Sequence, residues 1–266
     1  MFLNNPRTAL ITGSSSGIGY ELARLFAKDL YNLVIVARDR ARLDRIASDF
    51  QNEFGVKVKV LAKDLSHYSA SREIFSELKQ ESIKVDVLVN NAGFGTYGFF
   101  AETSLQNELE MMQVNMVSLT ELTKLFLPNM IQKKSGKIMN VASTAAFEPG
   151  PLMAVYYATK AYVLSFSEAL ANELKGTGVT VTALCPGITR SGFQKRAEME
   201  SSRLAQRWLM SAEKVAKIGY RGLMRNKTVV IPGLRHKALA FIVRFFPRNF
   251  VTQAVRRVQE SVKHKY

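Results

Sequence analysis

The strongest constraint on the fold is a glycine-rich segment that joins a short apolar stretch to a helical one near the N-terminus. Residues 7–12 are largely apolar and β-branched, which predicts a buried strand, and residues 20–30 have the spacing of an amphipathic helix. The connection is Gly13-Ser14-Ser15-Ser16-Gly17-Ile18-Gly19. Its glycines permit a tight turn and let backbone N–H groups approach a diphosphate, which the helix N-terminus also attracts. This order of elements predicts a dinucleotide-binding unit, although Gly-x3-Gly-x-Gly differs from the commoner Gly-x-Gly-x2-Gly.

Strand-like and helix-like segments alternate along the rest of the chain. Further strands are expected at residues 33–37, 56–62, 85–89, 137–141, 179–185 and 228–231. Helices are expected at residues 39–54, 69–82, 105–131 and from Tyr156 onward. Because parallel strands need helical crossovers, the alternation predicts an α/β fold in three layers, a doubly wound parallel sheet covered by helices on both faces.

The composition fits one domain with a full core, or one domain with an appendage, since 47% of the 266 residues are hydrophobic and 22% are charged. The single cysteine, Cys185, excludes an internal disulfide framework, fits a reducing compartment and ends an apolar run, so we expect a buried strand residue. The N-terminus lacks the pattern of a signal peptide, and no apolar run approaches the ~20 residues that span a bilayer. We therefore expect a cytoplasmic protein, and no motif suggests a metal site.

The formal charge of +15 is concentrated at the C-terminal end. Residues 203–266 hold fifteen Lys or Arg and two acidic side chains, a net of +13, which leaves +2 for the first 202 residues. This distribution predicts a local surface that attracts anions. It does not predict a uniformly basic nucleic-acid-binding protein, so we expect no nucleic-acid partner.

Tyr156 and Lys160 stand four residues apart, and residues 161–170 that follow contain neither Gly nor Pro. On a helix, this spacing places both side chains on one face. A nearby ammonium favours the phenolate, so we expect the pKa of Tyr156 to fall and the phenol to serve as a proton donor or acceptor. The same spacing also arises by chance in a chain with nine tyrosines. Tyr157 lies about 100° further round the helix and is expected to pack in the core or at an interface.

The end of the second predicted strand carries Ala37 and Arg38. In dinucleotide sites an acidic residue near this position binds the ribose 2′-OH, whereas an arginine accommodates a 2′-phosphate. The sequence therefore favours NADP(H) over NAD(H). Asp39, the next residue, is expected to cap the following helix.

Together these motifs resemble the short-chain dehydrogenase/reductase family, in its single-domain, NADP(H)-preferring form, over about residues 7–231. The resemblance implies a Rossmann-type sheet of about seven strands in the order 3-2-1-4-5-6-7, with the site at the carboxyl ends of the strands. It implies a catalytic tetrad of Asn115, Ser143, Tyr156 and Lys160. It also implies cofactor contacts at Gly13, Ser15, Ser16, Gly17, Ile18, Gly19, Arg38, Asp64, Leu65, Asn91, Ala92, Gly93, Tyr156, Lys160, Pro186, Gly187, Thr189 and Ser191.

Two positions depart from the family pattern. Ser191 replaces a usual threonine and keeps a hydroxyl, and Ser16 stands where some NADP-dependent members carry a basic residue. The expected preference for NADP(H) therefore depends on Arg38 and on the missing acid at Ala37.

The resemblance implies an oxidoreductase that transfers a hydride from NADPH to a ketone or aldehyde carbonyl, or the reverse alcohol oxidation. Tyr156 would donate the proton, and Ser143 would hydrogen-bond the carbonyl oxygen. Lys160 would lower the pKa of Tyr156 and hold the ribose hydroxyls, and Asn115 would hold a water that links Lys160 to solvent.

We expect residues 1–233 to form the Rossmann-type domain, with a substrate lid at about residues 188–210. Apolar side chains suggest a hydrophobic or acyl-type substrate, which the sequence does not identify. They are Phe193 and Trp208 in the lid, and Phe94 and Phe147 on neighbouring loops at the strand ends. Basic side chains in the lid either meet an anionic head or carrier or are simply solvated.

Residues 234–266 form a basic and aromatic extension, which Pro247 divides into two predicted short helices. Two arrangements remain open. The favoured one folds Phe241, Phe245 and Phe246 back over the pocket or a second subunit and leaves the basic face free for anionic lipid. The other lays the apolar stripe in a membrane interface, as a peripheral contact.

We expect a small carbonyl or alcohol substrate as the main partner and, from the resemblance, a homodimer or homotetramer. The alternative functions are a non-catalytic NADP(H)-binding regulator and a membrane-surface protein. The complete tetrad argues against the regulator.

Overall fold

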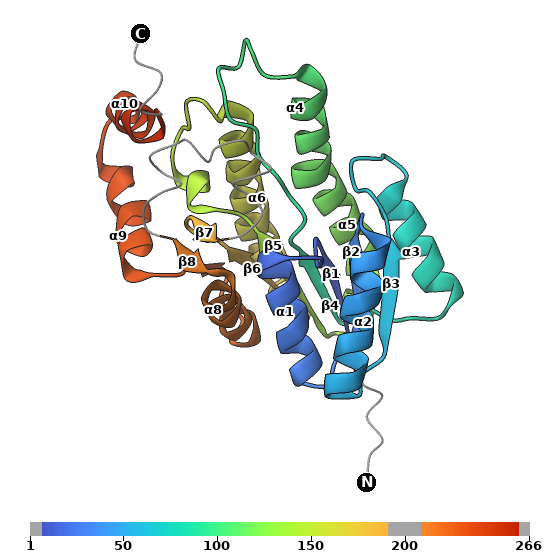
Figure 1. The fold of residues 1–266 in the computed structure, drawn as a ribbon. Helices are drawn as coiled ribbons and strands as arrows, with labels where there is room; N and C mark the ends of the chain where they lie inside the picture. The colour runs from blue at the N-terminus through green and yellow to red at the C-terminus, as the bar shows by residue number, and fades with distance from the viewer. Residues whose placement is uncertain (1–6, 191–208, 261–266) are drawn as a thin grey trace.

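Seven parallel strands form one sheet in the computed structural model, which describes residues 7–190 and 209–260 (Figure 1). From edge to edge they are β3 (Val58–Ala62), β2 (Asn32–Ala37), β1 (Thr8–Thr12), β4 (Val87–Asn90), β5 (Gly136–Val141), β6 (Val179–Leu184) and β9 (Val229–Val230). The predicted order 3-2-1-4-5-6-7 is confirmed, with β9 as the seventh strand. The strand order reverses between β1 and β4, which is where doubly wound sheets bind ligands at their carboxyl ends.

Helices cover both faces of the sheet. They are α1 (Gly17–Lys28), α2 (Arg40–Phe54), α3 (Ala70–Gln80), α4 (Leu105–Met112), α5 (Leu119–Gln132), α6 (Ala154–Glu173), α8 (Ala212–Met224), α9 (Leu234–Ile242) and α10 (Arg248–Gln259). On β1, Ala9 and Ile11 join the core formed with α1, α2 and α8, whereas Leu10 joins the core formed with α3, α5 and α6. Side chains alternate between the faces of a strand, so a strand covered on both sides is apolar throughout. Figure 1 shows α1 and α8 side by side on one face.

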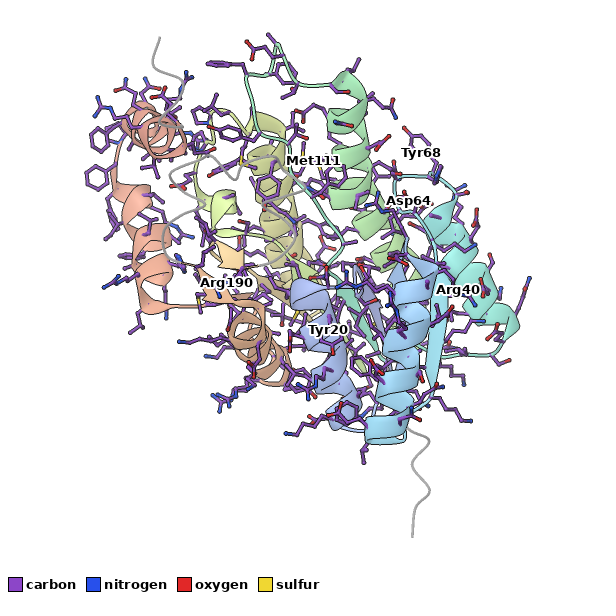
Figure 2. The ribbon with its side chains drawn as sticks, in the orientation of Figure 1. Tyr20, Arg40, Asp64, Tyr68, Met111 and Arg190 are labelled. Atoms are coloured by element: carbon purple, nitrogen blue, oxygen red, sulfur yellow. The ribbon has the colours of Figure 1, made fainter. Side chains whose placement is uncertain are left out.

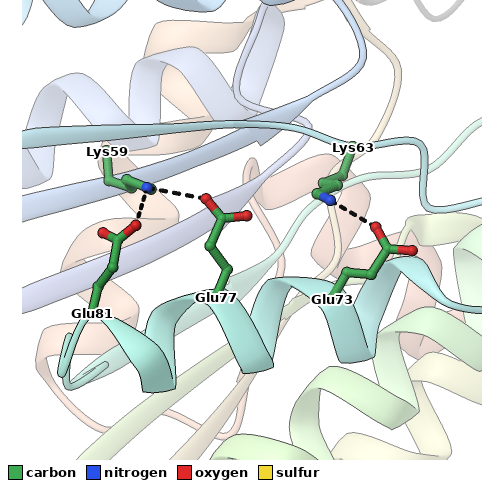
Figure 3. A network of polar contacts seen from close by, with 5 residues as sticks. All are labelled: Lys59, Lys63, Glu73, Glu77 and Glu81. Atoms are coloured by element: carbon green, nitrogen blue, oxygen red, sulfur yellow. Dashed lines mark hydrogen bonds and ion pairs between the residues drawn. The ribbon is translucent and has the colours of Figure 1, made fainter.

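Charged side chains line the edge of the sheet at β3, where α3 packs alongside (Figure 3). Lys59 contacts Glu77 at 3.0 Å and also pairs with Glu81, and Lys63 contacts Glu73 at 2.7 Å. Exposed pairs of this kind contribute only about 0–1 kcal/mol each. Their placement matters more, because charges along an edge strand discourage pairing with a strand of another molecule.

A π-helical turn interrupts the long helix that the sequence predicted at residues 105–131. α4 ends at Met112, the π turn spans Gln113–Ser118, and α5 begins at Leu119. A π turn holds one residue more than an α turn and often occurs at functional sites. The apolar pattern did not reveal it, because the residues on both sides of the turn are helical and the predicted helix simply continued through it. Asn115 lies within this turn.

A short parallel pair of strands, β7 (Thr189–Arg190) and β8 (Met210–Ser211), was not predicted, because each strand has only two residues. The pair holds together the two ends of the expected lid at residues 188–210, and Figure 2 labels Arg190 on β7. Residues 191–208 of that lid lie outside the described residues.

The chain after β9 forms two short helices separated at Pro247, as predicted. A 3-10 turn at Val243–Phe245 follows α9, and α10 starts at Arg248. Val251 and Val255 of α10 are buried in the core, so this part of the tail does pack on the domain. No helix within residues 7–190 or 209–260 has the length and apolarity needed to cross a bilayer.

The tail phenylalanines do not fold back over the cavity, so this part of the favoured arrangement is wrong, while their burial against a second subunit stays a prediction. Phe241, Phe245 and Phe246 are 60%, 72% and 48% exposed, whereas Ala240 is the buried residue of α9. The small and branched side chains of the tail therefore make the packing contacts, and the aromatic rings face outward.

Candidate active site

A cavity of about 790 Å³ opens at the carboxyl ends of the strands, beside the reversal of strand order. It brings together most of the residues predicted to bind the cofactor or to act in catalysis. These are Gly13, Ser15, Ser16, Gly17, Ile18, Arg38, Asp64, Leu65, Asn91, Ala92, Gly93, Ser143, Tyr156, Lys160, Pro186, Gly187 and Thr189. Gly19 and Asn115 lie behind the wall, and Ser191 lies outside the described residues.

The glycine turn after β1 folds tightly against β2. Gly13 and Gly17 adopt φ angles of +65° and +58°, which favour glycine, and the Gly13 N–H donates to the Val36 carbonyl at 2.8 Å. A Cβ at Gly19 would lie 2.3 Å from the Gly13 carbonyl oxygen. Gly19 therefore lets α1 pack closely on the turn, while Gly13 and Gly17 line the cavity.

Asn91 and Thr12 fasten the end of β4 to this turn. The Thr12 hydroxyl accepts hydrogen bonds from the N–H groups of Asn91 and Ala92, both at 3.0 Å. The Asn91 side-chain amide donates to the carbonyls of Thr12 at 2.8 Å and Gly13 at 3.1 Å. These bonds fix the backbone on both sides of the reversal, so this part of the cavity wall is preorganised.

The N-terminus of α1 faces the cavity and suits a phosphate-bearing cofactor. Ser16 at the N-cap makes no side-chain capping hydrogen bond, and the first turn of α1 carries no acidic residue. The amide N–H groups and the positive end of the helix dipole therefore meet no competing anion from the helix itself. The residues that line the cavity, its volume and the N-terminus of α1 all fit a diphosphate with attached ribose and nicotinamide.

Arg38 and Asp64 lie at the far rim of the cavity, in the loops after β2 and β3, and Figure 2 labels Asp64. Their side chains form a long ion pair of 3.7 Å, and the Arg38 side chain is 57% exposed. Asp64 also accepts hydrogen bonds from the N–H and hydroxyl of Ser66. Partial burial opposes ionisation of Asp64, but the Ser66 bonds and Arg38 outweigh it and lower the pKa. Asp39 caps α2 by accepting from the Arg42 N–H, as predicted.

Tyr156 and Ser143 meet on the floor of the cavity. Their side chains are hydrogen-bonded, and the Ser143 hydroxyl also accepts from the Ala145 N–H at 3.1 Å. Burial raises the pKa of Tyr156 to about 12, against the lowering effect of Ser143. The expected fall of this pKa is wrong for the protein without bound cofactor, because desolvation of the phenolate exceeds every favourable contact.

Lys160 lies one helical turn from Tyr156, as the spacing predicted, and is only 5% exposed. Its ammonium donates to the Val141 carbonyl at 2.9 Å and lies 5.7 Å from the centre of the Tyr156 ring. Burial lowers the pKa of Lys160 to about 8. The ammonium is thus held at the cavity wall by the end of β5, close to the phenol.

Asn115 joins the π turn to α6 behind the cavity. Its carboxamide accepts from the Phe94 N–H at 3.1 Å and donates to the Phe94 carbonyl and the Thr159 hydroxyl, both at 3.0 Å. A Cβ on Gly93 would lie 2.9 Å from the Asn115 oxygen and 3.4 Å from the Lys160 nitrogen. Asn115 and Lys160 therefore both lie so close to residue 93 that a side chain larger than that of glycine would not fit there.

The predicted substrate residues are only partly placed in this region. Phe94 is 5% exposed and Phe147 contacts the Arg244 guanidinium at 6.0 Å, but neither lines the cavity. Phe193 and Trp208 lie outside the described residues. The cavity wall instead contains residues that the sequence did not single out for it. These are Val36, Asp39, Lys63, Val114, Val141, Ala142, Thr144, Ala145, Met153 and Tyr157. Ala37 and Ile188, which were expected at the cofactor site and in the lid, also line the cavity.

The tail helices reach the rim of the cavity. The His236 ring lies against Gly187, where an added Cβ would come within 2.4 Å of it. The Gln259 amide donates to the Tyr157 hydroxyl at 2.7 Å, and the Gln259 carbonyl accepts from the Tyr97 hydroxyl at 2.7 Å. Tyr157 packs edge-on against Tyr156, so α10 connects through one ring to the cavity floor.

A buried polar chain crosses the sheet beneath the site. Asn90 of β4 donates to Asn140 of β5 at 2.9 Å, and Asn140 donates to Ser167 of α6 at 3.0 Å. Asn90 and Asn140 are register partners. The signal in the sequence was an asparagine next to buried apolar residues in each of the two strands. Cys185 is fully buried, as predicted, and burial raises the pKa of its thiol to about 12.

In a comparison with known protein families, residues 7–201 of the chain match the family model described as short chain dehydrogenase. The chain therefore belongs to the short-chain dehydrogenase/reductase family. It is an oxidoreductase of that family, which acts on carbonyl or alcohol groups with an NAD(P)(H) cofactor.

Two curated relatives and one solved structure illustrate the similarity. The chain is 30% identical to the ketoacyl reductase HetN of Nostoc sp., across 85% of this chain and 78% of that protein. It is 37% identical to a very-long-chain 3-oxoacyl-CoA reductase of Phaeosphaeria nodorum, but across 70% of this chain and only 56% of that protein. A short-chain dehydrogenase from Sphingobium yanoikuyae in complex with NADPH superposes with a TM-score of 0.81 and 32% identity, covering 97% of this chain and all of that one.

Proposed function

We propose that this protein is an NADPH-dependent reductase that transfers a hydride to the ketone or aldehyde carbonyl of a hydrophobic or acyl-type substrate, or oxidises the corresponding alcohol. The observation that carries the proposal is that Ser143, Tyr156 and Lys160 line the same cavity as the glycine turn. A bound nicotinamide there supplies the hydride for the carbonyl carbon.

Tyr156 is the proton donor in this proposal. With a pKa of about 12 it carries its proton at neutral pH, ready for the carbonyl oxygen as charge develops there. General-acid catalysis of this kind contributes ~10²–10⁴ in rate. The Ser143 hydroxyl, already bonded to Tyr156, is positioned to donate a second hydrogen bond to the same oxygen and to fix its place.

Lys160 stabilises the phenolate that remains after proton transfer. Its ammonium lies 5.7 Å from the Tyr156 ring in a buried environment, where the attraction between the charges is stronger than in water. It also lines the cavity, where it can bind ribose hydroxyls. Asn115 fixes the backbone of Phe94 beside Lys160. We propose that a water molecule binds next to Asn115 and links Lys160 to solvent, so that Tyr156 regains its proton.

The preference for NADPH over NADH rests on the rim at β2. Arg38 is more than half exposed and its ion pair with Asp64 is long, so the guanidinium can turn to a 2′-phosphate. Ala37 brings no carboxylate that would repel that phosphate. The NADPH complex of the relative from Sphingobium yanoikuyae supports this assignment.

The substrate class rests on the apolar part of the cavity wall and on the names of the relatives. Val114, Ala145 and Met153 offer carbon surface to a non-polar substrate. Both curated relatives reduce oxoacyl groups by name, which favours an acyl-type substrate.

A homodimer or homotetramer is proposed from an exposed stripe on α4. Leu105, Leu109 and Met112 recur with helical spacing and are 71%, 51% and 39% exposed. Apolar residues in such a stripe are suited to contact the same face of a second copy. Light scattering measures the number of copies.

The test of the function is a panel of 3-oxoacyl esters, aromatic ketones and aldehydes, followed by loss of NADPH absorbance. We expect turnover with NADPH well above that with NADH, and loss of most turnover in Tyr156→Phe with NADPH binding retained. Retention of most of the wild-type kcat in Tyr156→Phe refutes the assigned role. NADPH binding without turnover of any substrate favours the alternative, a non-catalytic NADP(H)-binding regulator.

A further inference from the structure

The tail presents a continuous set of exposed apolar side chains on α9, the 3-10 turn and the start of α10, which lie together at the side of the molecule in Figure 1. We call this set the aromatic face. Its members are Leu234, Leu239, Phe241, Ile242, Phe245, Phe246 and Phe250, all between 47% and 86% exposed. Seven large apolar residues within seventeen positions form a patch, since isolated exposed residues elsewhere are ordinary.

The rings of the aromatic face are arranged in two contacting pairs. Phe241 and Phe245 meet edge-on with centroids 5.2 Å apart, and Phe246 and Phe250 stack with centroids 5.4 Å apart. At ~200 Å² for a whole side chain, the four rings alone expose on the order of 450 Å². That area matches the largest patches on ordinary monomers, which are often functional.

The opposite side of α10 packs on the domain, and Ala240 of α9 is also buried. Val251, Val255 and Gln259 are buried, and Gln259 is hydrogen-bonded to Tyr97 and Tyr157. The aromatic face is therefore presented by a packed element.

Basic residues alternate with the aromatic face along the same segment of the chain. Residues 234–260 carry six Lys or Arg and one acidic side chain, Glu260, which already pairs with Arg256 at 2.6 Å. The basic residues are Arg235, Lys237, Arg244, Arg248, Arg256 and Arg257. An apolar patch with cations nearby complements a surface that has an apolar interior and anionic groups on its outside.

We propose that the aromatic face docks on the surface of a bilayer that contains anionic lipid. Phenylalanine rings enter the boundary between headgroups and acyl chains, and each cation near an anionic surface adds attraction. α9 has nine residues, so the element lies on the membrane and does not span it. A second copy is a poorer occupant, because a symmetric contact would bring two such basic surfaces face to face.

This proposal does not depend on the reaction assigned above, and it is tested with the full chain. Sedimentation is measured with vesicles of phosphatidylcholine alone and of phosphatidylcholine with 30% phosphatidylserine. We expect binding to the phosphatidylserine vesicles that weakens in high salt. Phe241→Ala with Phe245→Ala should lower the partition coefficient roughly tenfold or more. Lys237→Gln with Arg248→Gln should lower it on the order of 25-fold.

Phe100→Ala is the matched control, because that ring is 66% exposed but lies before α4, outside the aromatic face. It should bind vesicles as the wild type does. Circular dichroism and a thermal melt check that every variant is folded. Equal binding to both vesicle types, no binding, or binding that survives the double phenylalanine change overturns the proposal. If light scattering shows that the double change dissociates an oligomer that never binds vesicles, a second copy covers the face instead.

Discussion

The contact between Gln259 and Tyr157 leads to the sharpest prediction about stability. Gln259 is 1% exposed, and its side-chain nitrogen donates to the Tyr157 hydroxyl at 2.7 Å. Its side-chain oxygen has no hydrogen-bond partner among residues 7–190 and 209–260. In Gln259→Leu the bond to Tyr157 is lost, while the bond from Tyr97 to the backbone carbonyl of residue 259 is kept.

The magnitude follows from what each change leaves unpaired. Gln259→Leu removes a bond with a net value of about 0.5–1.5 kcal/mol and leaves a buried hydroxyl, at a cost of about 1–3 kcal/mol. It also removes an unpaired buried oxygen, which offsets part of that cost, so the net loss should be roughly 1–2 kcal/mol. Tyr157→Phe leaves both ends of the amide unpaired and should cost a similar amount. The double variant has apolar groups on both sides and should be nearly as stable as the wild type.

The assay is urea unfolding followed by circular dichroism for the wild type, both single variants and the double variant. Since each single change costs roughly 1–2 kcal/mol and the double variant stays near the wild type, the coupling energy of this cycle should be roughly 2–4 kcal/mol, with the double variant more stable than additivity predicts. Gln253→Leu, an exposed change on the same helix, should stay within about 0.5 kcal/mol of the wild type. Additivity of the two single changes within about 0.5 kcal/mol would refute the reasoning.

Two further predictions concern the cavity, and a third concerns the partly buried carboxyl of Glu148, which does not line it. In Gly93→Ala the new methyl group would lie 2.9 Å from the Asn115 oxygen, so kcat should fall at least tenfold while the thermal midpoint changes little. An unchanged kcat would show that Asn115 does not need its close contact with residue 93. Ala37→Asp with Arg38→Leu should make the protein prefer NADH to NADPH, and competition between the two cofactors measures this preference. If the wild-type protein uses both cofactors equally, Arg38 is only a surface charge. Burial raises the pKa of Glu148 from 4.5 to about 7, so the folded state binds its proton more tightly than the unfolded state. The resulting stabilisation is complete below pH 4.5 and is lost as the pH rises to about 7, by up to roughly 3 kcal/mol. The free energy of unfolding, measured with urea, should therefore fall between pH 5 and 7.5 in the wild type, and Glu148→Gln should remove this dependence on pH. An equal slope in both proteins assigns the pH dependence to other groups.

Local signals determined much of the fold in advance. The strand, glycine turn and helix at residues 7–30 are encoded within one short stretch, and the apolar runs of the later strands reflect burial on both faces. The spacing of Tyr156 and Lys160 likewise predicted one helix face, because helical geometry alone fixes it.

What the sequence could not predict depends on contacts between distant residues. The pKa of Tyr156 is raised by burial, which no spacing of Tyr and Lys reveals. The Asn90–Asn140 bond requires the register of β4 and β5. The tail phenylalanines were expected to pack because they are apolar, but the smaller Val251 and Val255 occupy the available contact with the domain.

The π turn between α4 and α5 makes this segment sensitive to length. Deleting one residue within Gln113–Ser118 would convert the π turn into an ordinary α turn, which holds one residue fewer, so α4 and α5 could keep their orientation. Leu122 and Phe126 would then stay in the core. The turn that places the Asn115 carboxamide against the Phe94 backbone would be lost, so the deletion would change the site more than the fold. An alignment gap at this point would therefore mark a rebuilt site rather than harmless variation.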